Sequence, residues 1–217
     1  ELSIVIPVFN EQEVIPILKD SIQKFFSQTS FHYELILIND ASTDNTEKLL
    51  EQWQMDDEHI RVLHLSENIG HQRAILEGLK MSKGDLIITM DADLQDPLEE
   101  IPNMIEKGNE GFEIVHMRRI SRKGETVFRK MSAWTYYRIA KIFYPKILMD
   151  VGDFRLMTKN VVKRFFTDGT DDILIRKVAP NLSVSQTIIP YHRQRRVAGT
   201  SKFSLGKLVQ LAFLSGT

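Results

Sequence analysis

An acidic stretch behind one apolar segment carries the clearest chemistry in the sequence. Residues 86–90 are apolar and rich in β-branched side chains, as expected of a buried strand, and Asp91, Asp93 and Asp96 follow at once. If the chain stays extended there, side chains alternate, so that Asp91, Asp93 and Gln95 share one face. Carboxylate and amide oxygens on one face suit Mg²⁺ or Mn²⁺ holding a diphosphate. Acids also form turns, so a solvated loop stays open as an alternative.

The rest of the chain contains elements that could hold these acids at the edge of a sheet. Apolar runs with strand character alternate with apolar stripes at helical spacing. The expected strands cover residues 2–8, 34–38, 61–65, 86–90 and 112–117, with a helix between each successive pair. This alternation predicts an α/β fold with a mostly parallel sheet and helices on both faces.

Polar side chains stand at the carboxyl ends of several of these strands. Asn10 and Glu11 follow the first strand, and Asp40 follows the second. Because the carboxyl ends of parallel strands meet at one edge of a sheet, we expect these residues and the acids at 91 and 93 to line one cleft. Asp40, Asp91 and Asp93 could then divide the base, the ribose and the cation of a nucleotide among themselves.

Local signals predict how the helices begin and what the histidines do. Asn10 with Glu13 predicts a helix start that resembles a capping box, and Asp96 is predicted to cap the helix that follows it. Neither the spacing of a Ser/His/acid triad nor that of metal ligands surrounds His64 or His71, so we predict structural or capping roles for both.

Composition and missing motifs exclude several classes of function. The net charge of −1 predicts no general attraction to nucleic acid, and the absence of cysteine excludes disulfide frameworks and thiolate metal sites. The chain has no G-x-G-x-x-G after its first strand and no G-x-x-x-x-G-K-[ST], which argues against dinucleotide and P-loop sites. Phosphate charge must therefore be met by a metal and by side chains. No segment reaches the roughly 18 apolar residues of a membrane span.

The second half of the chain differs in character from the first. Basic residues cluster over residues 118–130, and aromatic residues follow over 134–144. The guanidinium group of arginine binds phosphate oxygens through two parallel hydrogen bonds. Basic residues beside aromatic ones are also typical of a surface that binds a membrane or an anionic lipid. A solvated basic face is the simpler alternative.

The chain is expected to form one domain, because its 217 residues are 42 % hydrophobic and show no repeat or linker. Residues 1–117 form the predicted nucleotide-binding half, and residues 118–202 form a second half that carries the basic and aromatic residues. Residues 203–217 form an amphipathic segment that suits either the core or a membrane interface.

Several motifs together resemble the family 2 inverting glycosyltransferases. The matching segments are VIPVFNE from Val5, NDASTD from Asn39, N-x-G from Asn68, MDADLQDP from Met90 and GDFRLM from Gly152. The last two are most similar to the polyprenyl-phosphate branch, which includes relatives of dolichyl-phosphate mannose synthase and bacterial undecaprenyl-phosphate sugar transferases. The resemblance implies the GT-A nucleotide-sugar fold and transfer of a sugar to a polyprenyl phosphate at the cytoplasmic face of the cell membrane. In that branch, membrane helices often follow this part of the chain.

The resemblance also implies roles for individual residues in donor binding. The nucleotide pocket would be lined by Pro7, Asn10, Glu11, Asp40 and Asp91. Within it, Asp40 would bind the base and Asp91 would lie near the ribose or the diphosphate. Asp93 and Gln95 would bind Mg²⁺ or Mn²⁺. The sequence does not settle the base of the donor, because a carboxylate at Asp40 can accept from N3–H of uracil or from N1–H of guanine, and a UDP-linked donor is only weakly preferred.

The resemblance makes residues 118–202 the acceptor-side half and implies catalytic and acceptor groups there. Asp153 stands where the proposed base of the family lies, and Arg118 and Arg129 match arginines that meet phosphates. The acceptor side would further include Ser132, Arg196, Ser201 and Lys202. A phosphate monoester has a second pKa of about 6, so the acceptor is largely dianionic near neutral pH and hardly needs a base. Asp153 is therefore either a base or a positioning residue.

Two other functions stay open at this point. A family 2 enzyme acting on a soluble or polysaccharide acceptor would keep the nucleotide site without a lipid role for the basic and aromatic segment. A non-catalytic nucleotide-sugar binding module would bind a nucleotide without transfer, although the intact acidic cluster argues against it. The sequence predicts neither the sugar nor the oligomeric state.

Overall fold

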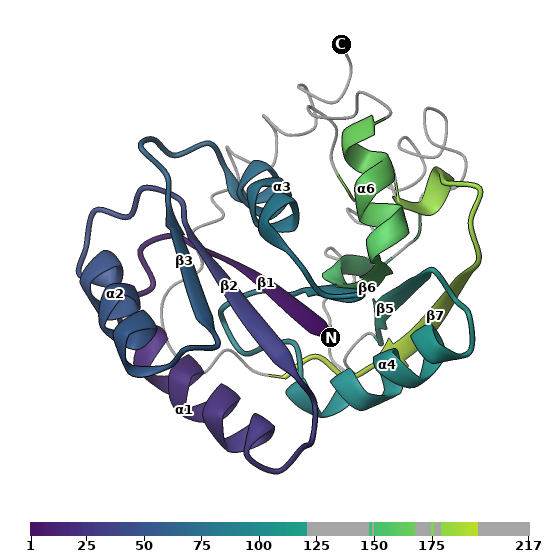
Figure 1. Cartoon of the computed structure of the whole chain (residues 1–217), viewed down its shortest axis with the longest axis horizontal. Coiled ribbons are helices and arrows are strands. Elements are labelled where there is room, and N and C mark those ends of the chain that lie inside the picture. Colours follow the sequence, from purple (N-terminus) through teal and green to yellow (C-terminus); the bar gives the residue numbers. More distant parts are fainter. Residues whose placement is uncertain (121–147, 149, 168–174, 176–178, 195–217) are drawn as a thin grey trace, which may run out of the picture.

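The described residues form one seven-stranded sheet with the strand order β3-β2-β1-β4-β6-β5-β7 (Figure 1). This computed structural model describes residues 1–120, 148, 150–167, 175 and 179–194. The strands are β1 (Leu2–Val8), β2 (Tyr33–Asn39), β3 (Ile60–His64), β4 (Leu86–Thr89), β5 (Ile114–Arg119), β6 (Val151–Thr158) and β7 (Gln186–Tyr191). All neighbours pair in parallel except β6, which runs antiparallel to both β4 and β5. The expected mostly parallel sheet is thus confirmed.

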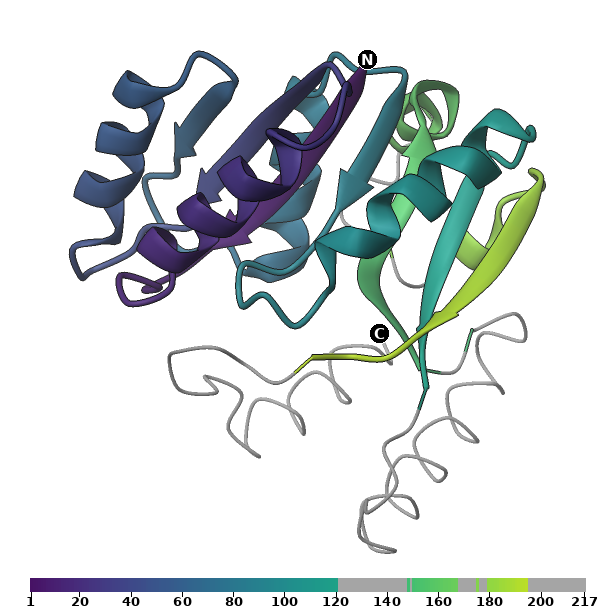
Figure 2. The same cartoon turned by 90° about the horizontal axis from the view of Figure 1, so that it is seen from below.

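Helices cover both faces of the sheet, as the sequence predicts (Figures 1 and 2). The described helices are α1 (Ile15–Phe26), α2 (Thr46–Asp56), α3 (His71–Met81), α4 (Ile101–Asn109) and α6 (Lys159–Thr167), with short 3₁₀ turns at η1 (Leu98–Glu100) and η2 (Ala179–Asn181). One core cluster joins the sheet to α1, α2 and α4, and the other joins it to α3 and α6. None of the helices in the described part of the chain is long and apolar enough to cross a membrane.

The two faces follow from the alternation of apolar side chains along buried strands. On β1, Ile4 and Ile6 belong to the first cluster and Val5 to the second, and all three are fully buried. Val5 packs against α3, where a Cβ on Gly78 would lie 2.4 Å from the Val5 side chain. The glycine therefore lets α3 approach β1 closely, and this contact fixes the position of the first residue of α3, His71.

The predicted helix caps are wrong. Helix α1 begins at Ile15 with a proline in its first turn and without a side-chain cap. The Oδ1 of Asn10 instead accepts a hydrogen bond from the backbone N–H of Thr43 at 2.6 Å. Asn10 has a φ of 52°, so the chain turns there before the helix starts. The side chain of Asp96 caps no helix either, because it bonds to a tyrosine of β7.

Candidate active site

The acidic loop after β4 is folded back rather than extended. β4 ends at Thr89, and Leu94 adopts a left-handed conformation with a φ of 55°. The Oδ1 of Asp93 accepts a hydrogen bond from the backbone N–H of Gln95 at 3.1 Å, which tightens the turn. Ala92 and Leu94 are buried in the core cluster. The expectation of an extended loop with alternating faces is therefore wrong, because burial of the apolar residues between the acids bends the chain.

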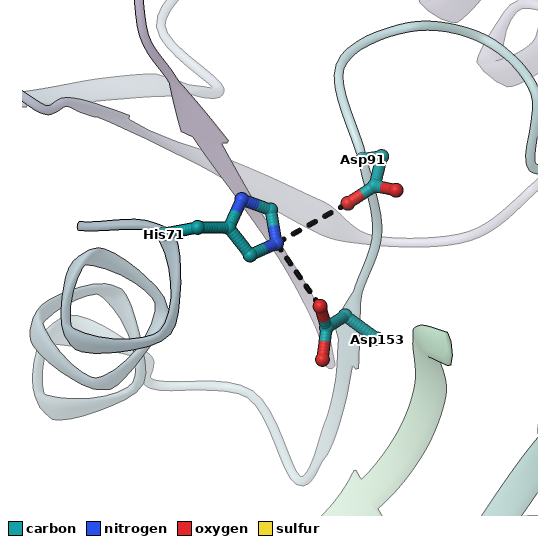
Figure 3. A group of neighbouring side chains, drawn as sticks. All are labelled: His71, Asp91 and Asp153. Carbon is teal, nitrogen blue, oxygen red and sulfur yellow. Dashed lines mark hydrogen bonds and ion pairs between the residues drawn. The ribbon is translucent and has the colours of Figure 1, made fainter. Parts of the chain in front are cut away.

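A histidine bridges two of the acids at the centre of the site (Figure 3). The Nε2 of His71 lies 3.0 Å from Asp153 Oδ2 and 3.3 Å from Asp91 Oδ1. Asp153 is only 2 % exposed. Burial by itself lowers the pKa of His71, but the hydrogen bonds and charges of Asp153 and Asp91 outweigh it and raise this pKa to about 10. At neutral pH the imidazole is therefore a cation held between two carboxylates.

The loop that carries His71 is held by Asp40. The Oδ1 of Asp40 accepts a hydrogen bond from Ile69 N–H at 2.8 Å, and its Oδ2 accepts one from Gly70 N–H at 3.0 Å. The side chain of Asn68 donates to the backbone oxygen of Asp40 at 3.1 Å. Gly70 has a φ of 90°, which suits glycine. Asp40 thus shapes the entry to α3, and its contact with a base stays a prediction.

The sequence indicates only a structural or capping role for His71, and its contacts with the acids are a finding of the structure. One signal could have indicated them: His71 directly follows the Asn68-x-Gly70 motif, at the carboxyl end of β3. This is the same edge of the sheet at which the acids lie. His64, by contrast, has the structural role expected, since its Nδ1 lies 3.1 Å from the side-chain nitrogen of Asn39.

Arginines face the acids from the far half of the sheet. The Nη2 of Arg193 lies 3.5 Å from Asp91 Oδ2 and 3.8 Å from Asp93 Oδ2. The Nη2 of Arg119 lies 4.0 Å from Asp91 Oδ2. Gly152 leaves room for Arg119, because a Cβ there would lie 2.5 Å from that nitrogen. The charges and hydrogen bond of His71 outweigh the effect of burial and lower the pKa of Asp91, and Arg119 adds to this.

A tyrosine ties the acidic loop to β7. The hydroxyl of Tyr191 donates to Asp96 Oδ1 at 2.6 Å, and the Nε of Arg119 donates to the Tyr191 oxygen at 3.2 Å. Burial, together with the charge of Asp91, raises the pKa of Asp96 to about 6, against the hydrogen bond from Tyr191. Burial and the charge of Asp96 also raise the pKa of Tyr191. Asp96 therefore joins β4 to β7 rather than capping a helix.

The chain that leaves β7 lies against the same loop. The backbone N–H of Gln194 donates to the backbone oxygen of Gln95 at 3.0 Å, and the side-chain Nε2 of Gln95 donates to the backbone oxygen of Gln194 at 3.2 Å. We call Arg193 and Gln194 the β7 exit. The predicted metal ligand Gln95 is thus engaged through its amide nitrogen, and its binding of a metal stays a prediction.

The loops after β1 and β2 are joined to each other at this edge. The backbone N–H of Asn10 donates to Ser42 Oγ at 2.9 Å, and that of Glu11 donates to Thr46 Oγ1 at 2.8 Å. Pro7 lies in β1 opposite Ile38. The predicted nucleotide residues Pro7, Asn10 and Glu11 therefore share one edge with the acids, as expected, and their contacts with a nucleotide stay predictions.

Left-handed backbone conformations are concentrated at this edge. Among the described residues, the non-glycine positions with positive φ are Asn10, Ala41, Leu94 and Asp150. The first three follow β1, β2 and β4, and Asp150 precedes the antiparallel β6, whose amino end lies at the same edge. Such conformations cost about 1 kcal/mol or more each and are often found at functional sites.

The structure does not bring every predicted residue to this cluster. Arg118 is exposed and its side chain makes no hydrogen bond or ion pair with the described residues, whereas its neighbour Arg119 points to the acids. Alternation along β5 accounts for the difference, since adjacent side chains point to opposite faces. The role proposed for Arg118 stays a prediction. The remaining predicted residues, Arg129, Ser132, Arg196, Ser201 and Lys202, lie outside the described residues.

The acids fit a divalent cation. Asp91 and Asp93 both direct a carboxylate oxygen to one guanidinium nitrogen, so the loop already presents them to a shared positive charge. His71, Asp91 and Asp153 form a second candidate group, whose ligand atoms lie within 4.8 Å of one another. In that group the protonated imidazole takes the place of a cation and cannot act as a ligand, so the carboxylates of Asp91 and Asp93 are the better candidates. Oxygen-rich sets of this kind suit Mg²⁺ or Mn²⁺.

The sheet and its edge site define the GT-A class of glycosyltransferase fold, as solved structures show. Mannosyl-3-phosphoglycerate synthase from Rubrobacter xylanophilus matches 99 % of this chain and 71 % of its own with a TM-score of 0.65 at 16 % identity. Glucosyl-3-phosphoglycerate synthase from Mycobacterium tuberculosis, in complex with UDP, matches 98 % of this chain and 76 % of its own with a TM-score of 0.61 at 18 % identity. Mannosyltransferase PcManGT from Pyrobaculum calidifontis, in complex with GDP-Man and Mn²⁺, matches 87 % of this chain and 54 % of its own with a TM-score of 0.59 at 15 % identity. At these identities the likeness concerns the fold.

The chain belongs to glycosyl transferase family 2, whose model matches residues 3–166. It is 37 % identical over 213 residues to glycosyltransferase YkcC of Bacillus subtilis, covering 98 % of this chain and 66 % of that protein. It is also 37 % identical over 213 residues to the prophage bactoprenol glucosyl transferase homolog of Escherichia coli, covering 98 % of this chain and 70 % of that protein. The chain thus spans about two thirds of the length of these relatives. The resemblance to the family and its lipid-linked branch is confirmed.

Proposed function

We propose that this chain transfers a sugar from a nucleotide-sugar to a polyprenyl phosphate at the cytoplasmic face of the membrane, with the help of a divalent cation. The observation that carries the proposal is the gathering of Asp91, Asp93 and Asp153 with His71 and Arg193 at the carboxyl edge of a GT-A sheet. The name bactoprenol glucosyl transferase, carried by relatives, supports a polyprenyl acceptor and a glucosyl donor. A UDP-linked donor is the form we test first.

The reaction is a displacement at the anomeric carbon. An oxygen of the acceptor phosphate attacks C1 of the sugar from the side opposite the leaving group. The bond between C1 and the diphosphate oxygen breaks, and its electron pair leaves with the nucleoside diphosphate. The configuration at C1 is inverted, and no proton needs to be removed because the acceptor is largely dianionic.

Asp93 and Gln95 would hold the cation, and we add Asp91, because its carboxylate and that of Asp93 face the same guanidinium nitrogen. When bound, the cation offsets the negative charge of the leaving diphosphate. Arg119 and Arg193 stand beside these acids and add positive charge where two phosphate-bearing reactants meet. The predicted phosphate-binding residues Arg118, Arg129 and Arg196 would add to this charge.

Asp153 fits a positioning role better than the role of a base. Its carboxylate is buried and accepts a hydrogen bond from His71, and Arg155 Nη2 lies 3.7 Å from its other oxygen. The contacts with His71 and Arg155 hold the carboxylate in a fixed orientation. We therefore assign Asp153 the orientation of a sugar hydroxyl and of His71.

The proposal is tested by direct product analysis. The purified protein is incubated with UDP-glucose and undecaprenyl phosphate in detergent, with Mg²⁺, Mn²⁺ or EDTA, and the lipid product is detected by mass spectrometry. UDP- and GDP-linked sugars are then compared, and a soluble oligosaccharide replaces the lipid in a parallel reaction. We expect a glycosylated lipid phosphate only when metal is present.

Two variants sharpen this test. Asp93→Ala should abolish metal-dependent transfer, and Asp20→Ala, which removes an exposed acid of α1, serves as the matched control. Transfer only to the soluble acceptor would overturn the lipid assignment, and unchanged activity of Asp93→Ala would overturn the metal assignment. Sedimentation with vesicles that contain anionic lipid tests association with a membrane.

A further inference from the structure

Arg193 occupies the place where a cation shared by two acids would be expected. Its Nη2 lies 3.5 Å from Asp91 Oδ2 and 3.8 Å from Asp93 Oδ2. The side chain of Arg193 is 28 % exposed, and those of Asp91 and Asp93 are 20 % and 7 % exposed. The arginine therefore lies partly buried against both carboxylates, where ion pairs are screened less than at a surface.

A divalent cation and this guanidinium compete for the same oxygens. A small divalent cation takes carboxylate oxygens at about 2.1 Å, so it draws both carboxylates inward to its own shell. The guanidinium nitrogen lies 3.5 Å and 3.8 Å from the two oxygens, and its positive charge repels a cation that approaches them.

We infer that Arg193 is a built-in counter-cation of Asp91 and Asp93, and that a divalent cation must displace it in order to bind. The inference rests on the metal site of the proposed function and adds a residue that regulates its loading. Release of Arg193 also strains the neighbouring contacts, because Gln194 is joined to Gln95 through two hydrogen bonds. Ion binding thus loosens the β7 exit from the acidic loop, and by reciprocity a displaced β7 exit strengthens ion binding.

The first experiment measures the affinity of the protein for Mn²⁺ alone by calorimetry, without nucleotide or acceptor. Arg193→Gln should bind Mn²⁺ about tenfold more tightly than the wild type, because the competing charge is removed. Arg164→Gln, which removes an exposed arginine of α6, is the matched control and should bind as the wild type does.

A third variant separates displacement from simple electrostatics. Arg119→Gln removes the same charge beside Asp91, but Arg119 makes no ion pair with Asp93 within the described residues. Displacement predicts a clearly smaller gain in Mn²⁺ affinity for Arg119→Gln than for Arg193→Gln. Equal gains for the two variants would show a general charge effect and would overturn the inference.

The second experiment uses the wild type and needs no variant to fold. Hydrogen exchange of the Gln194 amide, which donates to Gln95, is followed by nuclear magnetic resonance with and without Mg²⁺. We expect Mg²⁺ to accelerate this exchange several-fold, whereas unchanged or slower exchange at saturating Mg²⁺ would overturn the inference. If neither the wild type nor Arg193→Gln binds Mn²⁺ or Mg²⁺, the metal site of the proposed function is overturned together with the inference. If both bind Mn²⁺ with equal affinity, only the inference about Arg193 is overturned.

Discussion

The imidazole of His71 donates a hydrogen bond to the buried carboxylate of Asp153 over 3.0 Å, although α3 and β6 are far apart in sequence. The contact exists because β6 runs antiparallel to β4 and therefore brings its amino end to the edge where the parallel strands finish. The same imidazole nitrogen lies 3.3 Å from Asp91. The side chain of His71 thus connects α3 to the loop after β4 and to β6.

The contact with His71 leads to a prediction for Asp153. Asp153→Asn should lower kcat by about a hundredfold or more, because loss of the charge releases His71 and misplaces the reacting groups. We expect the loss at every pH between 6 and 9. The kcat profile is measured against pH, with the melting temperature as a check on folding. Partial recovery at high pH would instead identify Asp153 as a base.

The charged state of His71 predicts how stability depends on alkaline pH. Its pKa is raised from 6.5 to about 10 in the folded protein, so its stabilising contribution is fully present below pH 6.5 and is lost as the pH rises toward 10. His71→Gln should therefore be less stable than the wild type at pH 6, and the difference should shrink by pH 10. Urea unfolding at both pH values measures it. A difference that stays constant with pH would show that the imidazole carries no charge in this range.

His116 predicts a loss of stability in acid. It is fully buried in β5, and burial together with the charge of Arg155 lowers its pKa from 6.5 to about 4, against the hydrogen bond to Gln186. Because the unfolded chain binds the proton more readily, stability should fall by about 1 kcal/mol per pH unit as the pH falls from 6.5 toward 4.

Comparison with a variant isolates this effect from other titrating groups such as Asp96, whose raised pKa acts in the opposite direction. His116→Gln removes the titrating ring, and the stability difference between it and the wild type should vary with pH only in this window. Urea titrations at pH 4.5, 5.5 and 7 provide the measurement. A pH-independent difference would contradict a neutral buried histidine.

The hydrogen bond between Tyr191 and Asp96 predicts a cost for removing one hydroxyl. Tyr191→Phe should lower the free energy of unfolding by about 1–3 kcal/mol, because Asp96 Oδ1 and Arg119 Nε both lose their hydrogen bond to the Tyr191 hydroxyl. Tyr33→Phe is the control, since Tyr33 stacks on Phe26 and its hydroxyl makes no hydrogen bond with the described residues. Denaturant unfolding measures the free energy of unfolding of both variants. Equal losses in the two would show that the hydrogen bond of the Tyr191 hydroxyl adds no stability.

The sequence did not indicate β6, α6 or β7, but it was enough to predict the first five strands, the helices between them, the mostly parallel sheet and the family. These features depend on local periodicity and on short motifs, which act wherever the chain is placed. It also indicated that the polar groups after β1, β2 and β4 meet at one edge, because parallel strands leave no other arrangement.

The pairing of the acids of the site with their cationic partners depends on the tertiary structure. The bend at Leu94 arises because the core takes up apolar side chains between the acids, and the contacts of His71, Arg119 and Arg193 arise from the antiparallel β6 and from β7. Such contacts join residues far apart in sequence and leave no periodic trace in it. The site was therefore predictable as a place and a set of acids, whereas the cations that hold those acids follow from the packing of the sheet.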